Sequence, residues 1–307
     1  MSIMEGIKHK FLNSSGSYNY YKSKSLKLEK DKKNVENNNR ELKKDISQLK
    51  KLNDTFKKDN KFYDNLIRFL IYNKEFDDEV PNYCPFCGDI NKFDSFGIVP
   101  RERVRCKKCK SLERHRFFYL VFTRLYDDLF NKNVKLLHFA PEVIFYEFFS
   151  KKDNIDYYPV DINSEKYDKM NLSLKKEVNM ENIPYENETF DVIYNSHVLE
   201  HVPDDNKAIS ELYRVLKNNG TCFIAVPIHD ISETLEKEEY NTPELRLKYY
   251  GHSEHFRKYG KDFINKLYSA NFKVEEIVPK DIIENDSLRS VLNLNDEEQL
   301  FICKKNL

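Results

Sequence analysis

The chain has 307 residues, of which 40% are hydrophobic and 33% charged, so it is long enough for two folded units and apolar enough to bury a core. Its formal charge is zero, but residues 1–80 (18 basic, 13 acidic) and 81–133 (11 and 6) are basic, whereas residues 134–307 (22 and 32) are acidic. No stretch reaches the roughly 18 uncharged apolar residues of a membrane span, and the N-terminus has no signal-peptide pattern. We therefore expect a cytoplasmic protein without membrane contact, in which paired cysteines bind metal more often than they form disulfides.

An apolar residue recurs at every seventh position within residues 24–80, which follow a polar tail over residues 1–23. These positions are Leu28, Val35, Leu42, Leu49, Phe56, Tyr63 and Leu70. The second seam contains Asn39, Asn53 and Asn60, and asparagine there favours parallel dimers of fixed register. We expect a coiled-coil helix over 24–80 that makes a homodimer. A single solvated helix or a partly disordered Lys/Asn tract remains the alternative.

Residues 81–133 are predicted to form a zinc ribbon and a linking helix. Two CxxC pairs, Cys84 with Cys87 and Cys106 with Cys109, are separated by 18 residues. This spacing brings two turns to one tetrahedral ion, and four thiolates suit a structural zinc. From residue 111 to residue 130 the apolar residues return with a helical period, and Ser111 is the expected N-cap.

Eight basic residues surround the second cysteine pair: Arg101, Arg103, Arg105, Lys107, Lys108, Lys110, Arg114 and Arg116. Such a density is able to contact phosphate, or it simply keeps a small ribbon solvated. No aromatic side chain for base stacking occurs between residues 99 and 116, so nucleic acid is a possible partner but not the favoured one.

Strand and helix patterns alternate across residues 134–307. This alternation predicts a mostly parallel sheet with helices on both faces, and the last two strands fit an added edge pair. The expected strands cover residues 135–140, 156–162, 190–196, 221–228, 273–278 and 298–305.

The segment His197-Val198-Leu199-Glu200-His201 matches the H-x-x-E-H signature of a zinc protease. Two histidines four apart on a helix share one face and are able to hold a catalytic zinc. Pro203 ends such a helix within two residues, however, and no third ligand is identifiable. The protease interpretation is therefore not favoured.

The longer phrase IPYENETFDVIYNSHVLEHVPDDNKAISELYRVLKNNGTCFIAVP resembles the fourth and fifth strands of class I S-adenosylmethionine-dependent methyltransferases of the type 11 group. The chain also looks like bacterial members that place a CxxC pair and SLERHR before the core and APE after its first strand. Those members carry a G-x-x-x-H-x-R-x-YG element, which here contains His255, Arg257 and Tyr259. The resemblance covers residues 83 to about 275.

This resemblance implies a Rossmann-like class I methyltransferase sheet of seven strands, mostly parallel, and S-adenosylmethionine as cofactor. It implies that Asp161 accepts the ribose hydroxyls and that Asn179 and Met180 border the adenine. Asn195 and His197 would line the methionine side, with His197 also a catalytic candidate.

The turn after the first strand of this core contains no glycine, and none occurs between residues 98 and 219. We expect His138, Ala140 and Glu142 to contribute to the cofactor site nevertheless. Pro141 suits the first position of a helix, the N–H groups that follow can receive a carboxylate, and Glu142 is the expected acceptor for the cofactor's ammonium group.

On the acceptor side, His255 is the candidate general base and Arg257 a candidate clamp for an anionic substrate, with Tyr259 beside it. A capping or surface role is equally open for this group. The favoured function is methyl transfer to a small molecule or a sugar-containing metabolite, because the acidic core repels a polyphosphate. The alternatives are an RNA methyltransferase that grips its substrate with the basic ribbon, and a non-catalytic scaffold with a degenerate core.

Overall fold

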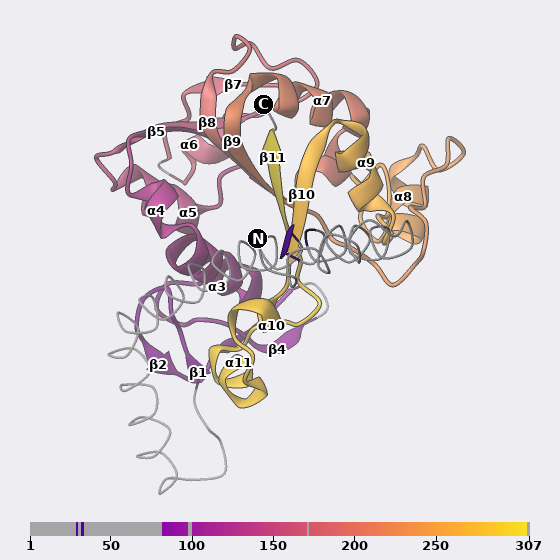
Figure 1. The fold of residues 1–307 in the computed structure, drawn as a ribbon. Helices are drawn as coiled ribbons and strands as arrows, with labels where there is room; N and C mark the ends of the chain where they lie inside the picture. The colour runs from indigo at the N-terminus through magenta and orange to yellow at the C-terminus, as the bar shows by residue number, and fades with distance from the viewer. Residues whose placement is uncertain (1–28, 30–31, 34–81, 98–99, 171, 306–307) are drawn as a thin grey trace, which may run out of the picture. The chain divides into compact units, whose positions relative to one another are not determined.

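The computed structural model describes residues 29, 32–33, 82–97, 100–170 and 172–305. The chain divides into two units, Met1–Glu75 and Phe76–Leu307, and the second contains all but three of the described residues (Figure 1). The polar tail and, apart from residues 29, 32 and 33, the coiled coil predicted over 24–80 lie outside the described residues.

Two small hairpins begin the second unit. Strand β1 (Asn82–Tyr83) pairs antiparallel with β2 (Ile90–Asn91), and β3 (Asp94–Phe96) pairs antiparallel with β4 (Arg101–Arg105). The first CxxC turn follows β1 and the second follows β4. The hairpins therefore bring the two cysteine pairs to one place, as the spacing predicts.

The linking helix is built in three pieces: α3 (Glu113–Leu120), the π-helical turn η2 (Val121–Leu125) and α4 (Asp127–Phe130). The predicted N-cap, Ser111, is wrong, because α3 has Leu112 at that position. The Ser111 hydroxyl instead lies 3.2 Å from Cys84 Sγ and 3.3 Å from Cys109 Sγ. The Ser111 hydroxyl thus contacts the cysteine cluster and does not cap the helix.

The main sheet has seven strands in the order β10-β11-β9-β8-β5-β6-β7. The strands from β9 to β7 run parallel, and β11 is antiparallel to both of its neighbours. Their bounds are β5 Val134–Phe139, β6 Ile155–Asp161, β7 Lys176–Glu177, β8 Phe190–Ser196, β9 Leu216–Ala225, β10 Phe272–Ile277 and β11 Leu300–Lys305. The predicted mostly parallel sheet is confirmed. The last two strands are not a simple edge pair, since β11 lies inside the sheet and only β10 is at the edge.

Helices complete this unit: α5 Val143–Ser150, α6 Glu165–Asp168, the 3-10 turn η3 Leu199–His201, α7 Asp205–Val215, α8 Pro243–Tyr250, α9 Phe263–Ser269, α10 Pro279–Ile282 and α11 Asp286–Leu292. The helix expected from His197 is only the three-residue turn η3, since Pro203 follows at once. Helix α7 then begins after Asp204, whose side chain accepts a hydrogen bond from Lys207 N at 3.0 Å.

The centre of the sheet is buried on both faces, which explains why the central strands β5 and β8 are mostly apolar. Adjacent residues of β5 face opposite ways: Leu136 packs with aromatic residues of α3 and α5, whereas Leu137 packs with Ile209 and Leu212 of α7. All four of these aliphatic side chains are fully buried. Helices α3 and α5 therefore cover one face, and α7 and α9 cover the other.

The ribbon is fastened to the C-terminal part of the chain by Arg116, which is fully buried. Its guanidinium donates to Leu292 O at 2.9 Å, to Asn293 O at 2.7 Å and to Val104 O at 3.1 Å. Figure 1 shows α10 and α11 beside the ribbon strands. Arg116 is thus not available to phosphate, contrary to its inclusion in the predicted basic surface. Within the described ranges, no helix is long and apolar enough to cross a membrane.

Candidate functional site

The carboxyl ends of β5, β6 and β8 meet at one edge of the sheet, because the three strands are parallel neighbours. Ala140 follows β5 there and adopts a φ of 47°, in the left-handed region that glycine normally occupies. Its N–H donates to Val160 O of β6 at 2.9 Å. The turn therefore keeps the backbone shape of a glycine turn, although an alanine there costs about 1–2 kcal/mol.

Glu142 occupies the N-cap position of α5, so Pro141 lies one residue before the cap and not at the first helical position as expected. Glu142 Oε1 accepts a hydrogen bond from Arg114 Nε at 3.1 Å and lies 2.7 Å from His115 Nε2. The other oxygen, Oε2, is buried and has no hydrogen-bond partner among the described residues. Burial raises the pKa of Glu142, but the charges of His115 and Arg114 outweigh it and hold the pKa well below its usual range. Oε2 of this ionised carboxylate is thus free to accept a hydrogen bond from a ligand.

Asn195 of β8 is fully buried beside Phe139 of β5. Neither its side-chain oxygen nor its nitrogen has a hydrogen-bond partner in the part of the chain that the structure describes. A buried polar group left unpaired costs about 1–3 kcal/mol. A polar ligand at this edge would remove that cost, which agrees with the prediction for Asn195.

His197 directly follows β8 and has a φ of 55°. Its Nδ1 lies 3.4 Å from Oε1 of the buried Glu200, while its Nε2 has no hydrogen-bond partner among the described residues. Burial lowers the pKa of His197, but hydrogen bonding to Glu200 and the charge of that carboxylate prevail and leave the pKa raised. A raised pKa favours the protonated ring and makes His197 a less effective general base, so its Nε2, unpaired among the described residues, is better suited to donate a hydrogen bond.

Asp161 ends β6 and its carboxylate is already engaged. Oδ1 accepts from Asn163 N at 2.9 Å, and Oδ2 accepts from Tyr167 Oη and Lys166 Nζ, each at 2.8 Å. Each oxygen has two lone pairs, so Oδ1 can still accept one further bond. The partners Lys166 and Tyr167 were missed by sequence reasoning, because the four-residue helix α6 has no pattern that marks it.

Three other predicted residues lie in different settings. The exposed Asn179 uses its Oδ1 to accept from Glu181 N at 2.8 Å, and Met180 is 3% exposed within the core that includes Val178. His138 is 1% exposed, and its Nδ1 lies 2.8 Å from Tyr157 Oη. Burial lowers the pKa of His138 to about 3. The structure therefore corrects the prediction for His138, whose buried side chain packs against Phe149 of α5 and does not reach the open edge of the sheet where the cofactor is expected.

Arg257 and Tyr259 are also corrected, because both are buried and fully used. Arg257 Nη1 donates to Leu199 O at 3.0 Å and to Val202 O at 2.6 Å, and its Nη2 donates to Glu236 Oε1 at 2.8 Å. Tyr259 Oη donates to Asp205 Oδ2 at 2.8 Å. These side chains hold the loop against η3 and α7, so they are not a clamp for a substrate.

His255, in contrast, is half-buried and lies close to His201 and His252. The ring centroids of His201 and His255 are 4.6 Å apart, and those of His252 and His255 are 4.8 Å apart. Burial lowers the pKa of His255 to about 4, which makes it a weak base at neutral pH.

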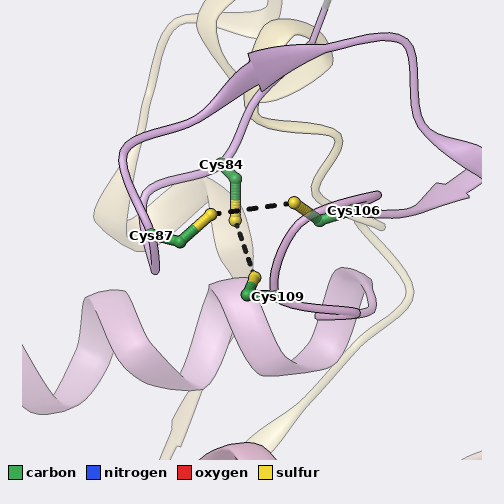
Figure 2. Close-up of side chains that lie close together, drawn as sticks. All are labelled: Cys84, Cys87, Cys106 and Cys109. Carbon is green, nitrogen blue, oxygen red and sulfur yellow. Dashed lines mark hydrogen bonds between the residues drawn. The ribbon is translucent and has the colours of Figure 1, made fainter.

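The four ribbon cysteines converge as predicted (Figure 2). The distance between Sγ atoms is 3.5 Å for Cys84 and Cys109 and 3.7 Å for Cys87 and Cys106. Sulfurs around a tetrahedral zinc, with Zn–S of about 2.3 Å, lie about 3.8 Å apart. All four are free thiols, and Gly88 N and Lys110 N donate to Cys84 O and Cys106 O in two equivalent turns. The residues fit a structural zinc.

A groove of about 1150 Å³ lies between the ribbon and α5. It reaches the cofactor edge through Ala140, Glu142 and Tyr167. Its lining contains two glutamates, Glu142 and Glu147, and six lysine or arginine residues, which are Arg105, Lys108, Lys110, Arg114, Lys151 and Lys166. The groove is therefore basic, although the core that forms one of its walls is acidic overall. This feature was not visible in the sequence because its lining comes from three separate segments.

The family model described as a methyltransferase domain matches residues 144–224. Similar solved structures include the YcgJ protein from Bacillus subtilis (14% identity, 60% of this chain and 97% of that chain, TM-score 0.39). Others are a putative methyltransferase from Bacillus halodurans (15%, 62% and 99%, 0.38) and a SAM-dependent methyltransferase from Archaeoglobus fulgidus (16%, 61% and 93%, 0.43). A search of curated proteins found no match.

Proposed function

We propose that this chain, whose core is a class I methyltransferase domain, transfers the methyl group of S-adenosylmethionine to a small anionic acceptor. The domain assignment combines the family match with the strand order, in which β11 runs antiparallel between β9 and β10. It bears out the family and fold predicted from the sequence. The acceptor is the new part of the proposal, and the basic groove is the observation that carries it.

Unpaired polar atoms at the edge support the cofactor assignment. Glu142 Oε2 would accept from the ammonium group of the cofactor, and Asn195 would bond the same end of it. Asp161 would take the ribose through its remaining lone pair, and Asn179 and Met180 remain the residues proposed for the adenine. When bound, S-adenosylmethionine supplies an activated methyl group. The protein then has only to align the acceptor with it.

Within the predicted class of small molecules and sugar-containing metabolites, the groove supports an anionic acceptor. Four of its six cations have carboxylate partners. Two of these pairs are exposed to solvent: Arg105 with Asp94 (3.9 Å) partly, and Lys151 with Glu147 (3.1 Å) largely. Exposed pairs are worth little and leave the charge available. A sugar phosphate or another small molecule with a phosphate or carboxylate would fit both the volume and the sign of this groove.

Calorimetric titration with S-adenosylmethionine tests the cofactor half of the proposal. We expect binding by the zinc-loaded chain and weaker binding by Asn195→Ala. An intact, folded protein that does not bind the cofactor would refute methyl transfer and favour the scaffold alternative.

Charge reversal in the groove tests the acceptor half. Lys108→Glu with Lys110→Glu should raise the KM for an anionic acceptor and leave cofactor affinity unchanged. Lys107→Glu is the matched control, because Lys107 is exposed on the same turn but does not line the groove. Equal KM values in the two variants would contradict the assignment of the groove.

RNA remains a second candidate, since the same lysines are able to contact a phosphate backbone. It is the weaker one because Arg116, which the sequence placed in the basic surface, is buried and donates to backbone carbonyl oxygens, and Arg114 is paired with Glu142. RNA binding that weakens steeply with salt would favour it. No binding at low salt would remove it.

We further propose a structural zinc in the four-cysteine site, a cytoplasmic location supported by six free thiols, and a homodimer formed through residues 24–80. The first rests on the sulfur geometry. The last rests on the heptad pattern alone.

A further inference from the structure

Three histidines from two separate segments meet on one side of the core. His201 ends η3, and His252 and His255 follow α8. Their nearest ring nitrogens all lie within 4.8 Å of one another. Each side chain is half-buried, so the cluster remains open to solvent and an ion is able to enter.

The backbone beneath the cluster is tied together. Phe256 N donates to Glu200 O at 2.8 Å, which joins the residue after His255 to the residue before His201. Arg257, from below, donates to carbonyl oxygens on both sides of His201. The two segments that carry His201 and His255 therefore form one unit, as a preorganised ligand set requires.

A negative charge lies beside the cluster. Glu200 precedes His201, is 1% exposed, and has an oxygen, Oε2, without a hydrogen-bond partner among the described residues. A buried carboxylate beside the cluster would offset part of the charge of a bound cation. It gives the cluster a second feature that favours a positively charged ligand.

We propose that His201, His252 and His255 form a three-nitrogen site for a divalent transition ion such as Zn²⁺, separate from the four-cysteine site. Imidazole suits zinc, copper and nickel. Three protein ligands leave one tetrahedral position for water or for an oxygen of another molecule. The binding of the ion does not depend on the proposed methyl transfer.

Metal binding requires a small closure of the rings. Nitrogens around an ion at about 2.0–2.1 Å lie about 3.4 Å apart in tetrahedral geometry. Glu254 N donates a long hydrogen bond to His252 Nδ1, at 3.2 Å. If His252 bound the ion through Nε2, its ring proton would move to Nδ1, and this hydrogen bond would be lost. The H-x-x-E-H pair of the sequence is not the ligand pair, because His197 faces Glu200.

Cobalt titration of the full-length chain, loaded with one equivalent of zinc to fill the four-cysteine site only, tests the three-histidine site with Co²⁺ alone as the probe. We expect visible absorption bands without the near-ultraviolet bands of cobalt thiolates, and their loss on addition of Zn²⁺. His252→Gln and His255→Gln should each weaken cobalt binding by at least about tenfold. His229→Gln is the matched control, since His229 is equally half-buried but lies outside the cluster.

Several outcomes would overturn the proposal. One is the absence of visible bands in the wild-type chain, a result that does not depend on how the variants fold. Another is cobalt binding by folded His252→Gln and His255→Gln that equals binding by His229→Gln. Thiolate bands that persist unchanged in those variants would assign the cobalt to the cysteines instead.

Discussion

At the scale of single residues, the cofactor edge brings together backbone strain and unpaired buried polar atoms. Ala140 adopts a positive φ, and Asn195 has a buried side chain with no hydrogen bond to a described residue. Such local costs persist where a ligand compensates them, and they cluster at functional sites. The edge is therefore better suited to binding than to stability.

Replacing Ala140 by glycine should relieve its backbone strain. The gain of about 1–2 kcal/mol from the left-handed region is reduced by the entropy of glycine, about 0.5–1 kcal/mol. Urea unfolding should show Ala140→Gly to be more stable by up to about 1 kcal/mol. Ala270→Gly is the control, because Ala270 has a φ of −87° and should lose stability. Equal losses in the two variants would exclude strain at Ala140.

Replacing Glu142 by glutamine should remove the carboxylate charge that pairs with the Arg114 guanidinium. The loss should be about 2 kcal/mol, as for hydrogen bonds to charged groups, whereas Glu147→Gln, on the exposed face of α5, should change stability by less than about 0.5 kcal/mol. The alanine variant is less informative, because it also leaves Arg114 unpaired.

Glu142 should also make the free energy of unfolding depend on pH in the acidic range. Its folded pKa is lowered, so its contribution is complete above the unfolded pKa of about 4.3 and is lost as the pH falls through the folded pKa. The difference in unfolding free energy between wild type and Glu142→Gln should be constant from pH 7 to about pH 5 and shrink in stronger acid. A difference that grows in acid would contradict the lowered pKa.

At the scale of elements, strands were easier to predict than the connections between them. Strands β5, β6 and β8 lie within a residue of their predicted bounds, because a strand buried on both faces is apolar along its whole length. The cysteine spacing likewise revealed the ribbon. Helix α6 stayed hidden because four residues are too few to show a helical pattern. The groove and the histidine cluster stayed hidden because each depends on residues that only the folded chain brings together. For the same reason, the buried roles of Arg116 and Arg257 could not be distinguished from surface charge.

The ribbon should bind cobalt through thiolates when it is prepared without zinc. Cys109→Ser removes one of four thiolates and should weaken the near-ultraviolet thiolate bands and the affinity for cobalt. Cys222→Ser is the control, since Cys222 is buried in β9 away from the cluster. It should keep the full intensity of these bands even if it unfolds at a lower temperature. Bands of unchanged intensity in Cys109→Ser would refute a four-cysteine site.

At the scale of the whole molecule, the methyltransferase domain was predicted correctly from one long phrase and the mostly parallel sheet from the alternation of strands and helices, while the dimer rests on the heptads alone. Leu42→Lys with Leu49→Lys places charges on the predicted seam and should convert a dimer to a monomer in sedimentation experiments. Ser47→Lys with Gln48→Lys adds the same charge off the seam and should leave the mass unchanged. A wild-type monomer would refute the prediction directly.

The position of β11 in the sheet constrains when the sheet can form during synthesis of the chain. Residues 300–305 are synthesised after every other strand of the sheet, yet they pair with both β9 and β10. While the ribosome still holds this segment, β9 has an open edge and β10 has no partner, so the nascent chain is exposed to aggregation. The sheet is therefore completed only after synthesis of its last strand, and a premature stop before residue 300 would detach β10 as well.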